Sequence, residues 1–391
     1  MAALRSKHLI GVGLVALAIA APACAGDDGS GNALAPVRAS AAAAKLPPLL
    51  PRSRGKTFYV ATSGSDSSPG TKQRPWKTIQ HALNRLRPGQ RALVRRGMYV
   101  QDHVIERSGT RTAPITVAAY PGERVVLRAA ATSGDTYPLR VSSGAAFFRI
   151  QGFILELAKG DSSTNVYFEG SAHDVELSRN EIRFSQDQGV FVENSTRNIH
   201  IIGNRIHDNG RGHQSGQHQS HGIYIEGADH LVANNVVHGH PYGFGIQIYP
   251  ENEGTIVVHN TVVGSGHSGI VVGGDGGVSN ITIRNNVLAF NARYGVQMDS
   301  DCPSAVTIDR NVIHGNRSGA IQGGCSGVDT SGGNLTSNPR FVAPGSRDYR
   351  LSPGSPAINR ARGDYSLRVD ARGRRRPLGG GYDVGAFEGV R

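Results

Sequence analysis

The sequence LVANNVVH at residues 231–238 returns as IVVHNTVV at residues 256–263 and as TIRNNVLA at residues 282–289. Each copy carries an asparagine in its fifth place, followed by a β-branched residue. The same asparagine recurs at intervals of 24, 31, 25, 26 and 25 residues. Its positions are Asn180, Asn204, Asn235, Asn260, Asn286 and Asn311. Self-similarity at this period is typical of a solenoid built from repeated coils.

A second repeated mark is a glycine that begins a short alternation of apolar residues. It occurs at Gly189, Gly222, Gly245, Gly269, Gly295 and Gly319. The strands that follow, such as residues 222–226, are short and show no helical period. Stacked as coils of a parallel solenoid, they bury Ile and Val and align identical residues. We therefore predict an all-β solenoid in which the asparagines form a ladder between coils.

The first 23 residues have the pattern of a secretory signal peptide. Arg5 and Lys7 precede an apolar stretch, and small residues follow it at 21–23. This stretch is too short to span a membrane, so we expect a secreted protein with no transmembrane segment. Cys24 directly follows the cleavage site, which makes a lipoprotein anchor an alternative, although the usual leucine of a lipobox is missing. Residues 24–54, rich in Ala, Pro, Gly and Ser, are expected to form a flexible linker.

The charge and the cysteines add two expectations. The net charge is +12, yet residues 145–325 contain 11 Lys and Arg against 17 Asp and Glu. The basic residues therefore lie outside the repeats, and no aromatic residues interleave them, so we expect no nucleic-acid binding.

Cys302 and Cys325 are 23 residues apart, nearly one coil. Stacked neighbours in an exported protein favour a disulfide over two free thiols. We expect a monomer.

Two terminal segments carry family patterns. One comprises Phe58-Tyr59-Val60, Pro75-Trp76-Lys77-Thr78-Ile79-Gln80 and Gly97-Met98-Tyr99, and the other is Asp383-Val384-Gly385-Ala386-Phe387-Glu388. They resemble the segments that open and close many exported right-handed parallel β-helix proteins. Thr78 is placed to cap a helix that covers the open end of the solenoid. The resemblance implies a single-stranded right-handed parallel β-helix over 55–391, with an N-terminal cap at 55–100, coils at 101–335 and a C-terminal cap at 336–391.

Two columns of outward residues follow from the glycine register. The first is Tyr167, Phe191, Tyr224, Gln247, Val271 and Gln297, and the second is Glu169, Glu193, Glu226, Tyr249, Gly273 and Asp299. Coils about 4.8 Å apart would bring the three glutamates of the second column close together. A cation, a basic substrate group or raised carboxyl pKa values would offset their repulsion. The alternative is a solvated row whose charges are screened.

The turn after this strand contains more acidic residues. Glu251, Asp275 and Asp301 share one register position in successive coils, and Asp299 lies beside them. Oxygen ligands clustered in this way suit Ca²⁺. The alternative is ordinary turn chemistry, in which Asp is common.

The turn before this strand holds an insertion rich in histidine, at residues 210–221. An insertion in one coil of a solenoid is a loop over one face, often the binding face. The residues that we expect to bind substrate here are His207, His218, His238, His240, Tyr242, Gln247 and Gln297. His and Tyr can exchange protons near neutral pH. Any single histidine can instead be a surface or turn residue, and a transition-metal site lacks a matching spacing.

The chain as a whole resembles right-handed β-helix enzymes, among them pectate lyases, the chondroitinase B and alginate lyase group, and mannuronan epimerases. The resemblance implies a polysaccharide lyase that abstracts the C5 proton of a uronic acid and eliminates the 4-linked sugar. Lys159, the only lysine of the repeats, lies away from the histidine loop, so the usual Lys or Arg base is missing. We expect His221 or Tyr224 as base, Arg211 or Gln247 near the substrate carboxylate, and Tyr249 as acid.

Other activities remain open on the same fold. A glycoside hydrolase needs two carboxylates, and Glu226 with Glu251 or Asp275 with Asp299 are candidate pairs. A uronate C5-epimerase shares the proton abstraction at C5. A non-catalytic carbohydrate-binding solenoid would present a uniform face, which the single insertion argues against.

Overall fold

The computed structural model describes residues 46–130, 137–157, 164–212, 220–274 and 277–389. All of them belong to one compact unit that begins at Ala43. The predicted signal peptide, Cys24 and most of the predicted linker lie outside the described residues. Within the described ranges, no helix is long and apolar enough to cross a membrane.

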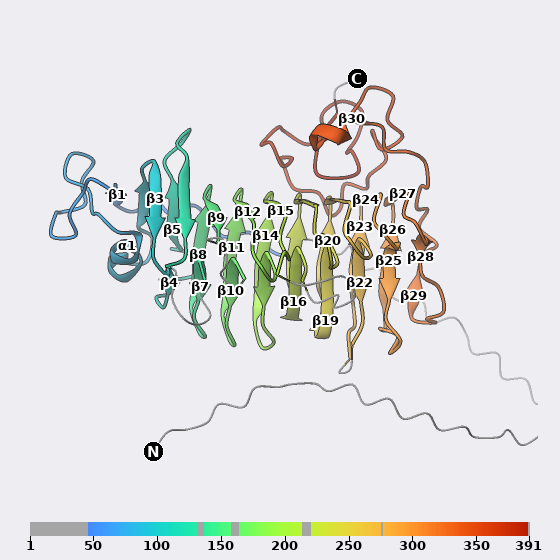
Figure 1. The fold of residues 1–391 in the computed structure, drawn as a ribbon, viewed down its shortest axis with the longest axis horizontal. Coiled ribbons are helices and arrows are strands. Elements are labelled where there is room, and N and C mark those ends of the chain that lie inside the picture. The colour runs from blue at the N-terminus through green and yellow to red at the C-terminus, as the bar shows by residue number, and fades with distance from the viewer. Residues whose placement is uncertain (1–45, 131–136, 158–163, 213–219, 275–276, 390–391) are drawn as a thin grey trace, which may run out of the picture. The chain divides into compact units, whose positions relative to one another are not determined.

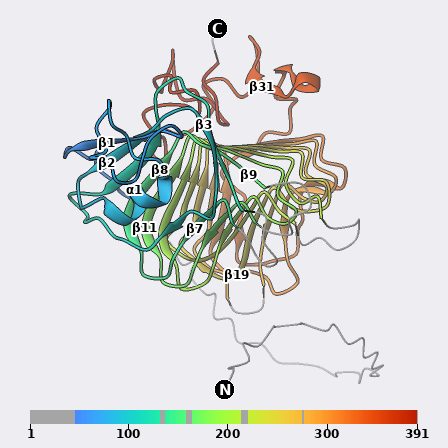
Figure 2. The same cartoon turned by 60° about the vertical axis from the view of Figure 1, so that its left-hand side comes forward.

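Three rows of stacked parallel strands wind into a right-handed β-helix (Figures 1 and 2). Row 1 contains β1 (Thr57–Val60), β2 (Arg91–Val94), β5 (Ile115–Ala119), β8 (Ala146–Gln151), β11 (His173–Ser178), β14 (Arg197–Ile202), β17 (Leu231–Ala233), β20 (Ile256–Val258), β23 (Thr282–Arg284), β26 (Val306–Asp309) and β29 (Val328–Asp329). Row 2 contains β4 (Val104–Ile105), β7 (Leu139–Val141), β10 (Val166–Phe168), β13 (Val190–Val192), β16 (Ile223–Ala228), β19 (Ile246–Glu253), β22 (Ile270–Val272), β25 (Tyr294–Met298) and β28 (Gly319–Ile321). Row 3 contains β3 (Gly97–Val100), β6 (Val125–Arg128), β9 (Ile154–Glu156), β12 (Glu181–Arg183), β15 (Arg205–His207), β18 (Val236–His238), β21 (Thr261–Val263), β24 (Val287–Ala289) and β27 (Val312–His314).

The predicted asparagine ladder is confirmed at the turn between rows 1 and 3. From Asn204 to Asn311, the side-chain oxygen of each ladder asparagine accepts from the backbone N–H and the side-chain amide of the asparagine one coil earlier. Asn260, for example, accepts both bonds of Asn235 at 2.9 Å, and its own amide donates to Val232 O at 2.8 Å. The ladder satisfies backbone groups that these tight turns would otherwise leave unpaired in the interior.

The interior is a narrow column of aliphatic side chains. Each strand turns alternate Ile, Val and Leu residues inward, where they stack on their counterparts in the neighbouring coils. The outward residues at the same positions are therefore held in register one coil apart. This register is what aligns the candidate functional residues along row 2.

The predicted N-terminal helical cap is present, and the predicted C-terminal cap segment lies along the side of the solenoid. The helix α1 (Ile79–Arg85) covers the first coil, buries Ile79, Ala82 and Leu83, and begins at Thr78, whose hydroxyl accepts from the His81 N–H at 3.1 Å. The C-terminal segment, residues 336–389, contains β30 (Phe341–Ala343), the 3₁₀ turn η1 (Pro344–Ser346) and β31 (Asp348–Leu351). It packs on the outer face of row 3, where Tyr349 and Leu351 join a cluster with strand residues.

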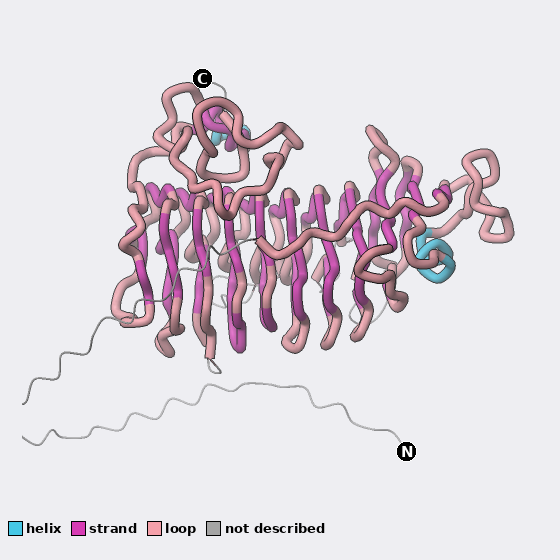
Figure 3. Tube along the Cα trace, turned by 180° about the vertical axis from the view of Figure 1, so that it is seen from behind, coloured by secondary structure: helices cyan, strands magenta, loops and turns pink. Residues whose placement is uncertain are grey.

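Residues 46–54, which the sequence predicts as the end of a flexible linker, lie along the outer face of row 1 as a loop across the strands (Figure 3). Leu50 O accepts a 2.6 Å hydrogen bond from Arg149, and the Ser53 hydroxyl donates to Pro114 O at 2.7 Å.

The predicted disulfide is also confirmed. Cys302 and Cys325 are bonded, with their Cα atoms 5.3 Å apart.

Candidate active site

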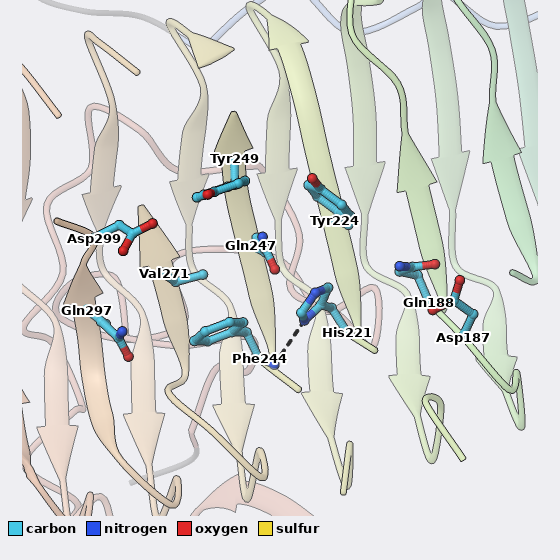
Figure 4. A pocket seen from close by; sticks show the side chains of 10 residues that line it. All are labelled: Asp187, Gln188, His221, Tyr224, Phe244, Gln247, Tyr249, Val271, Gln297 and Asp299. Atoms are coloured by element: carbon cyan, nitrogen blue, oxygen red, sulfur yellow. Dashed lines mark hydrogen bonds between the residues drawn. The ribbon is translucent and has the colours of Figure 1, made fainter. Parts of the chain in front are cut away.

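A pocket of about 490 Å³ opens on the outer face of row 2 (Figure 4). Six of the predicted functional residues line it together with four others. The lining residues are Asp187, Gln188, His221, Tyr224, Phe244, Gln247, Tyr249, Val271, Gln297 and Asp299. The strand register is as predicted, because Tyr224, Gln247, Val271 and Gln297 are paired in successive coils of β16, β19, β22 and β25.

His221 lies two residues before β16, and its ring is almost fully buried between Tyr224 and Phe244. Its Nδ1 accepts a hydrogen bond of 3.1 Å from the Phe244 backbone N–H. A backbone N–H can only donate, so the neutral ring must carry its proton on Nε2. His221 is therefore built to donate a hydrogen bond from Nε2, and it can accept a proton only by giving up the Phe244 contact.

Tyr224 ends a column of stacked rings that runs along row 2. The ring centroids of Tyr137 and Tyr167 are 4.9 Å apart, those of Tyr167 and Phe191 5.4 Å, and those of Phe191 and Tyr224 5.0 Å. This stacking fixes the orientation of the Tyr224 ring at the edge of the pocket. Its hydroxyl donates to Glu226, and burial together with the Glu226 charge raises the pKa of Tyr224.

Glu226 differs from the other glutamates of its column in how its charge is offset. Glu169 pairs with Arg140 at 2.7 Å. Glu193 accepts from the Tyr167 hydroxyl at 2.9 Å and from the Gly170 N–H at 2.7 Å. Glu226 accepts from the Asn194 N–H at 2.8 Å and from Tyr224 but forms no ion pair with a described cation.

Burial is the main cause that raises the pKa of Glu226 from 4.5 to about 7, and the charges of Glu193 and Glu251 contribute. The Asn194 and Tyr224 hydrogen bonds oppose this rise without cancelling it. The sequence analysis considered three ways to offset the repulsion between the glutamates of this column. At Glu226 the structure shows one of them, a raised carboxyl pKa. A carboxyl that titrates near neutral pH beside a pocket is suited to general acid–base catalysis.

Gln247 and Tyr249 come from β19 and reach the same pocket. Gln247 is nine-tenths buried, and its Oε1 has no hydrogen-bond partner within the described ranges. The Tyr249 ring packs over Gly274, where an added Cβ would lie 2.9 Å from the ring and where φ is +121°. Glycine is therefore required at 274 for Tyr249 to occupy this place.

The structure does not bring His207 and His238 to the pocket. Both lie on row 3, where their rings stack at 4.9 Å. The C-terminal segment covers them. Its Tyr349 ring lies 5.3 Å from the His238 ring, and its Arg347 donates a hydrogen bond to Asp208. Asp208 is also hydrogen-bonded to His207. Burial lowers the pKa of His238 to about 2, so this ring stays neutral.

The other predicted residues of the histidine loop also lie away from the lining of this pocket. His240 is fully buried at the turn between rows 3 and 2, and burial lowers its pKa to about 4. Arg211 donates to Asp208 O at 3.0 Å and lies over the Phe184 ring. Tyr242 is half-buried in the turn before β19 and does not line the pocket. His218 lies outside the described residues.

The predicted calcium ligands are divided between two places. Asp299 lines the candidate active site, whereas Glu251 lines a neighbouring pocket with Glu253. Asp301 follows in the next turn, and Asp275 lies outside the described residues. No three His, Cys, Asp or Glu side chains gather closely enough to hold a metal ion in the part of the chain that is described. The described members of this set, Glu251, Asp299 and Asp301, do not by themselves form a calcium site, and no step below depends on one.

Sequence reasoning missed three residues of the lining, Asp187, Gln188 and Phe244. Gln188, His221 and Phe244 each directly precede a glycine of the repeated mark, at Gly189, Gly222 and Gly245. The register that identified Tyr224 and Gln247 would also have identified this column, whose members lie one residue before each glycine. Figure 4 shows that this column forms the lower edge of the pocket.

Comparison with known proteins agrees with this geometry. A family model described as "Pel9A-like, right handed beta helix region" matches residues 58–219, and one described as "Right handed beta helix region" matches residues 164–338. The crystal structure of pectate lyase Pel9A is similar with a TM-score of 0.64 and 18% identity, over 89% of this chain and 99% of that chain. A rhamnogalacturonan lyase is similar with a TM-score of 0.53 and 14% identity, over 74% and 91%. A glycoside hydrolase is similar with a TM-score of 0.53 and 8% identity, over 72% and 96%.

The chain therefore belongs to the superfamily of right-handed β-helix proteins. Within this class, residues 58–219 match the Pel9A-like model. Two curated relatives match shorter stretches. Pectate lyase PEL9 of Emericella nidulans is 35% identical over 81 residues, or 20% of each chain, and the uncharacterized protein YwoF of Bacillus subtilis is 28% identical over 135 residues, 33% of this chain and 29% of its own. The matches span less than a third of either relative.

Proposed function

We propose that the chain is a secreted polysaccharide lyase that cleaves a uronic-acid-containing polysaccharide by β-elimination in the row 2 pocket. The observation that carries the proposal is the pair formed by Tyr224 and Glu226. A tyrosine hydroxyl at the pocket donates to a carboxylate whose pKa is about 7 and which has no described cation beside it. Relatives and structural neighbours named as pectate and rhamnogalacturonan lyases support the choice of substrate class.

The pair acts as the base for the C5 proton. As the C5–H bond breaks, the proton passes to the Tyr224 oxygen, and the Tyr224 hydroxyl proton passes to Glu226. The electron pair of the C5–H bond forms the C4–C5 double bond as the C4–O4 bond breaks. A base with a pKa near the working pH is well matched to this task. Tyr224 alone is a poor base at neutral pH because its pKa is raised, and the carboxylate of Glu226 removes that obstacle.

The substrate carboxylate is held by neutral donors. Nε2–H of His221 and the amide of Gln247 face the same pocket. Hydrogen bonds from these groups stabilise the negative charge that develops on the carboxylate as C5 loses its proton. His221 thus serves as a donor, which differs from its alternative sequence-based role as base. Arg211 has no part in this scheme because its side chain is held at Asp208 and Phe184.

Tyr249 completes the scheme as the acid that protonates the leaving O4. It lies on the same strand as Gln247, two residues further along, and therefore on the same face of row 2. Proton transfer by a positioned side chain contributes typically about 10²–10⁴-fold to a rate. Two tyrosines on either side of the sugar would divide the base and acid roles between them.

A glycoside hydrolase is the second candidate, favoured by one observation. Glu226 with a pKa of about 7 could act as a general acid, and Asp299 could supply the second carboxylate from the same face. The two candidates require opposite protonation states of Glu226. Elimination needs the carboxylate, whereas hydrolysis needs the protonated acid.

The test compares Tyr224→Phe with Tyr167→Phe on pectate, alginate and rhamnogalacturonan. Tyr167 is a matched control because it belongs to the same stack and also donates to a glutamate, at 2.9 Å. Elimination is followed by the ultraviolet absorbance of the unsaturated uronate. We expect Tyr224→Phe to lower the rate at least about 100-fold and Tyr167→Phe to change it less than about threefold. Equal effects of the two variants would refute the catalytic role of Tyr224.

A further inference from the structure

A second pocket, of about 570 Å³, lies between row 3 and the C-terminal segment. Four arginines line it, one from β15 and three from the C-terminal segment. They are Arg205, Arg347, Arg350 and Arg372, and Tyr349 and Phe387 line the pocket beside them. We call this pocket the arginine cleft.

Two of these arginines are neutralised by neighbours and two are not. Arg347 forms two hydrogen bonds with Asp208, at 2.6 and 3.0 Å, and Arg350 pairs with Asp348. Arg205 and Arg372 form no ion pair with a described carboxylate. Arg205 instead donates to the ring of His238 at 3.3 Å, and this ring is neutral. The cleft therefore has two arginines that no ion pair with a described carboxylate neutralises.

The arginine cleft and the row 2 pocket have opposite charge. The row 2 pocket is lined by Asp187 and Asp299 and by no arginine or lysine. The C-terminal segment from 339 to 389 contains ten arginines against five acidic residues. This segment therefore contributes a net charge of +5 on the side of the solenoid where the arginine cleft lies.

We propose that the arginine cleft is a non-catalytic binding site for the carboxylates of an acidic polysaccharide. The planar guanidinium fork of arginine matches a carboxylate in two hydrogen bonds. The ligand class rests on the proposed function, since the same polymer would be cleaved on row 2. A negatively charged polymer is attracted more strongly to this cleft than to the acidic pocket, so the cleft would hold the polymer near the enzyme between cleavage events.

Nucleic acid is the less favoured polyanion. Binding of single strands without sequence preference uses exposed aromatic rings on which bases stack. Tyr349 is 7% exposed and packs against Phe341, and Phe387 belongs to the apolar cluster beneath the C-terminal segment. The cleft thus offers charge and hydrogen bonds and little aromatic surface.

The test measures binding of tetragalacturonate by titration calorimetry to the full chain carrying Tyr224→Phe, in which we expect turnover at least about 100-fold slower. The cleft variant is Arg205→Gln with Arg372→Gln. The control variant is Arg360→Gln with Arg375→Gln, which removes the same net charge from exposed arginines of the same segment that do not line the cleft. We expect the cleft variant to raise Kd about fivefold, as for two partly screened charge contacts, and the control to change it less than about twofold.

Equal weakening by both variants, or no change with either, would overturn the inference. Tighter arginine-dependent binding of an oligodeoxythymidine than of tetragalacturonate would also overturn it, in favour of nucleic acid. The proposed function is judged separately, from product formation by the chain with Tyr224. Cleft-dependent binding without any elimination product would refute the proposed function and leave the arginine cleft supported.

Discussion

Replacing Glu226 by Gln is expected to stabilise the fold at pH 8 and to leave its stability unchanged at pH 4. Burial raises the folded pKa of Glu226 to about 7 from an ordinary 4.5. Between these values the folded chain binds a proton that the unfolded chain releases. The free energy of unfolding is therefore not reduced by Glu226 below pH 4.5, and it falls as the pH rises from 4.5 through 7. Glutamine has no charge to desolvate and keeps an oxygen for the Asn194 N–H.

The size of this effect follows from the pKa difference. A rise from 4.5 to about 7 corresponds to at most about 3 kcal/mol above pH 8, and solvent screening reduces this to about 1–2 kcal/mol. For a unit of this length, such a gain raises Tm by roughly 2 °C. The assay is thermal unfolding followed by circular dichroism at pH 4 and pH 8.

Glu193→Gln is the matched control, since Glu193 occupies the same column one coil away and is held by Tyr167 and Gly170. It should lower Tm or leave it unchanged at both pH values. The reasoning would be refuted if Glu226→Gln shifted Tm equally at pH 4 and pH 8, or if it destabilised the fold at pH 8.

Three further outcomes are expected. Elimination by the parent chain should rise as the pH increases from 5 to 8, because Glu226 must lose its proton; a kcat/KM that falls over this range would indicate a hydrolase with Glu226 as acid. Asn260→Ala should lower the free energy of unfolding by about 3–6 kcal/mol in denaturant titrations, since it leaves two donors of Asn235 and Val232 O unpaired. Reduction of Cys302–Cys325 should lower it by about 3 kcal/mol, from the entropy of a loop of 23 residues, and an unchanged midpoint would contradict this.

The solenoid could be predicted because its signals are local and periodic. The asparagines and glycines mark each coil in the sequence, and identical residues one coil apart become neighbours in space. Once Gly222 and Gly245 are aligned, the pairing of Tyr224 with Gln247 follows directly. The N-terminal end was predictable for a different reason, because Thr78 and the residues after it carry a recognisable capping pattern.

The site was predicted only in part, because the missing information is not periodic. His207 and His238 match one another in the repeat, yet nothing in the repeat indicates that Tyr349 and Arg347 cover their row. That contact joins residues more than 100 positions apart. The role of His221 likewise depends on a backbone N–H of the next coil, at Phe244, which fixes its tautomer.

The three glutamates of the second column have equivalent places in the repeat but different surroundings in the structure. From the sequence, Glu169, Glu193 and Glu226 are equivalent. In space, an arginine offsets the first, a tyrosine hydroxyl and a backbone N–H hold the second, and burial raises the pKa of the third. Of the three, the third has a pKa of about 7 and is hydrogen-bonded to a residue that lines the pocket, Tyr224.

The central claim, elimination by Tyr224 and Glu226, is tested most directly by proton NMR of the products formed from polygalacturonate in D₂O. The account predicts an olefinic C4–H signal of an unsaturated uronate from the parent chain and its loss in Tyr224→Phe. New reducing ends without that signal would show hydrolysis. Deuterium at C5 of an intact chain would show epimerisation. Either of these two results would contradict elimination as the reaction of this site.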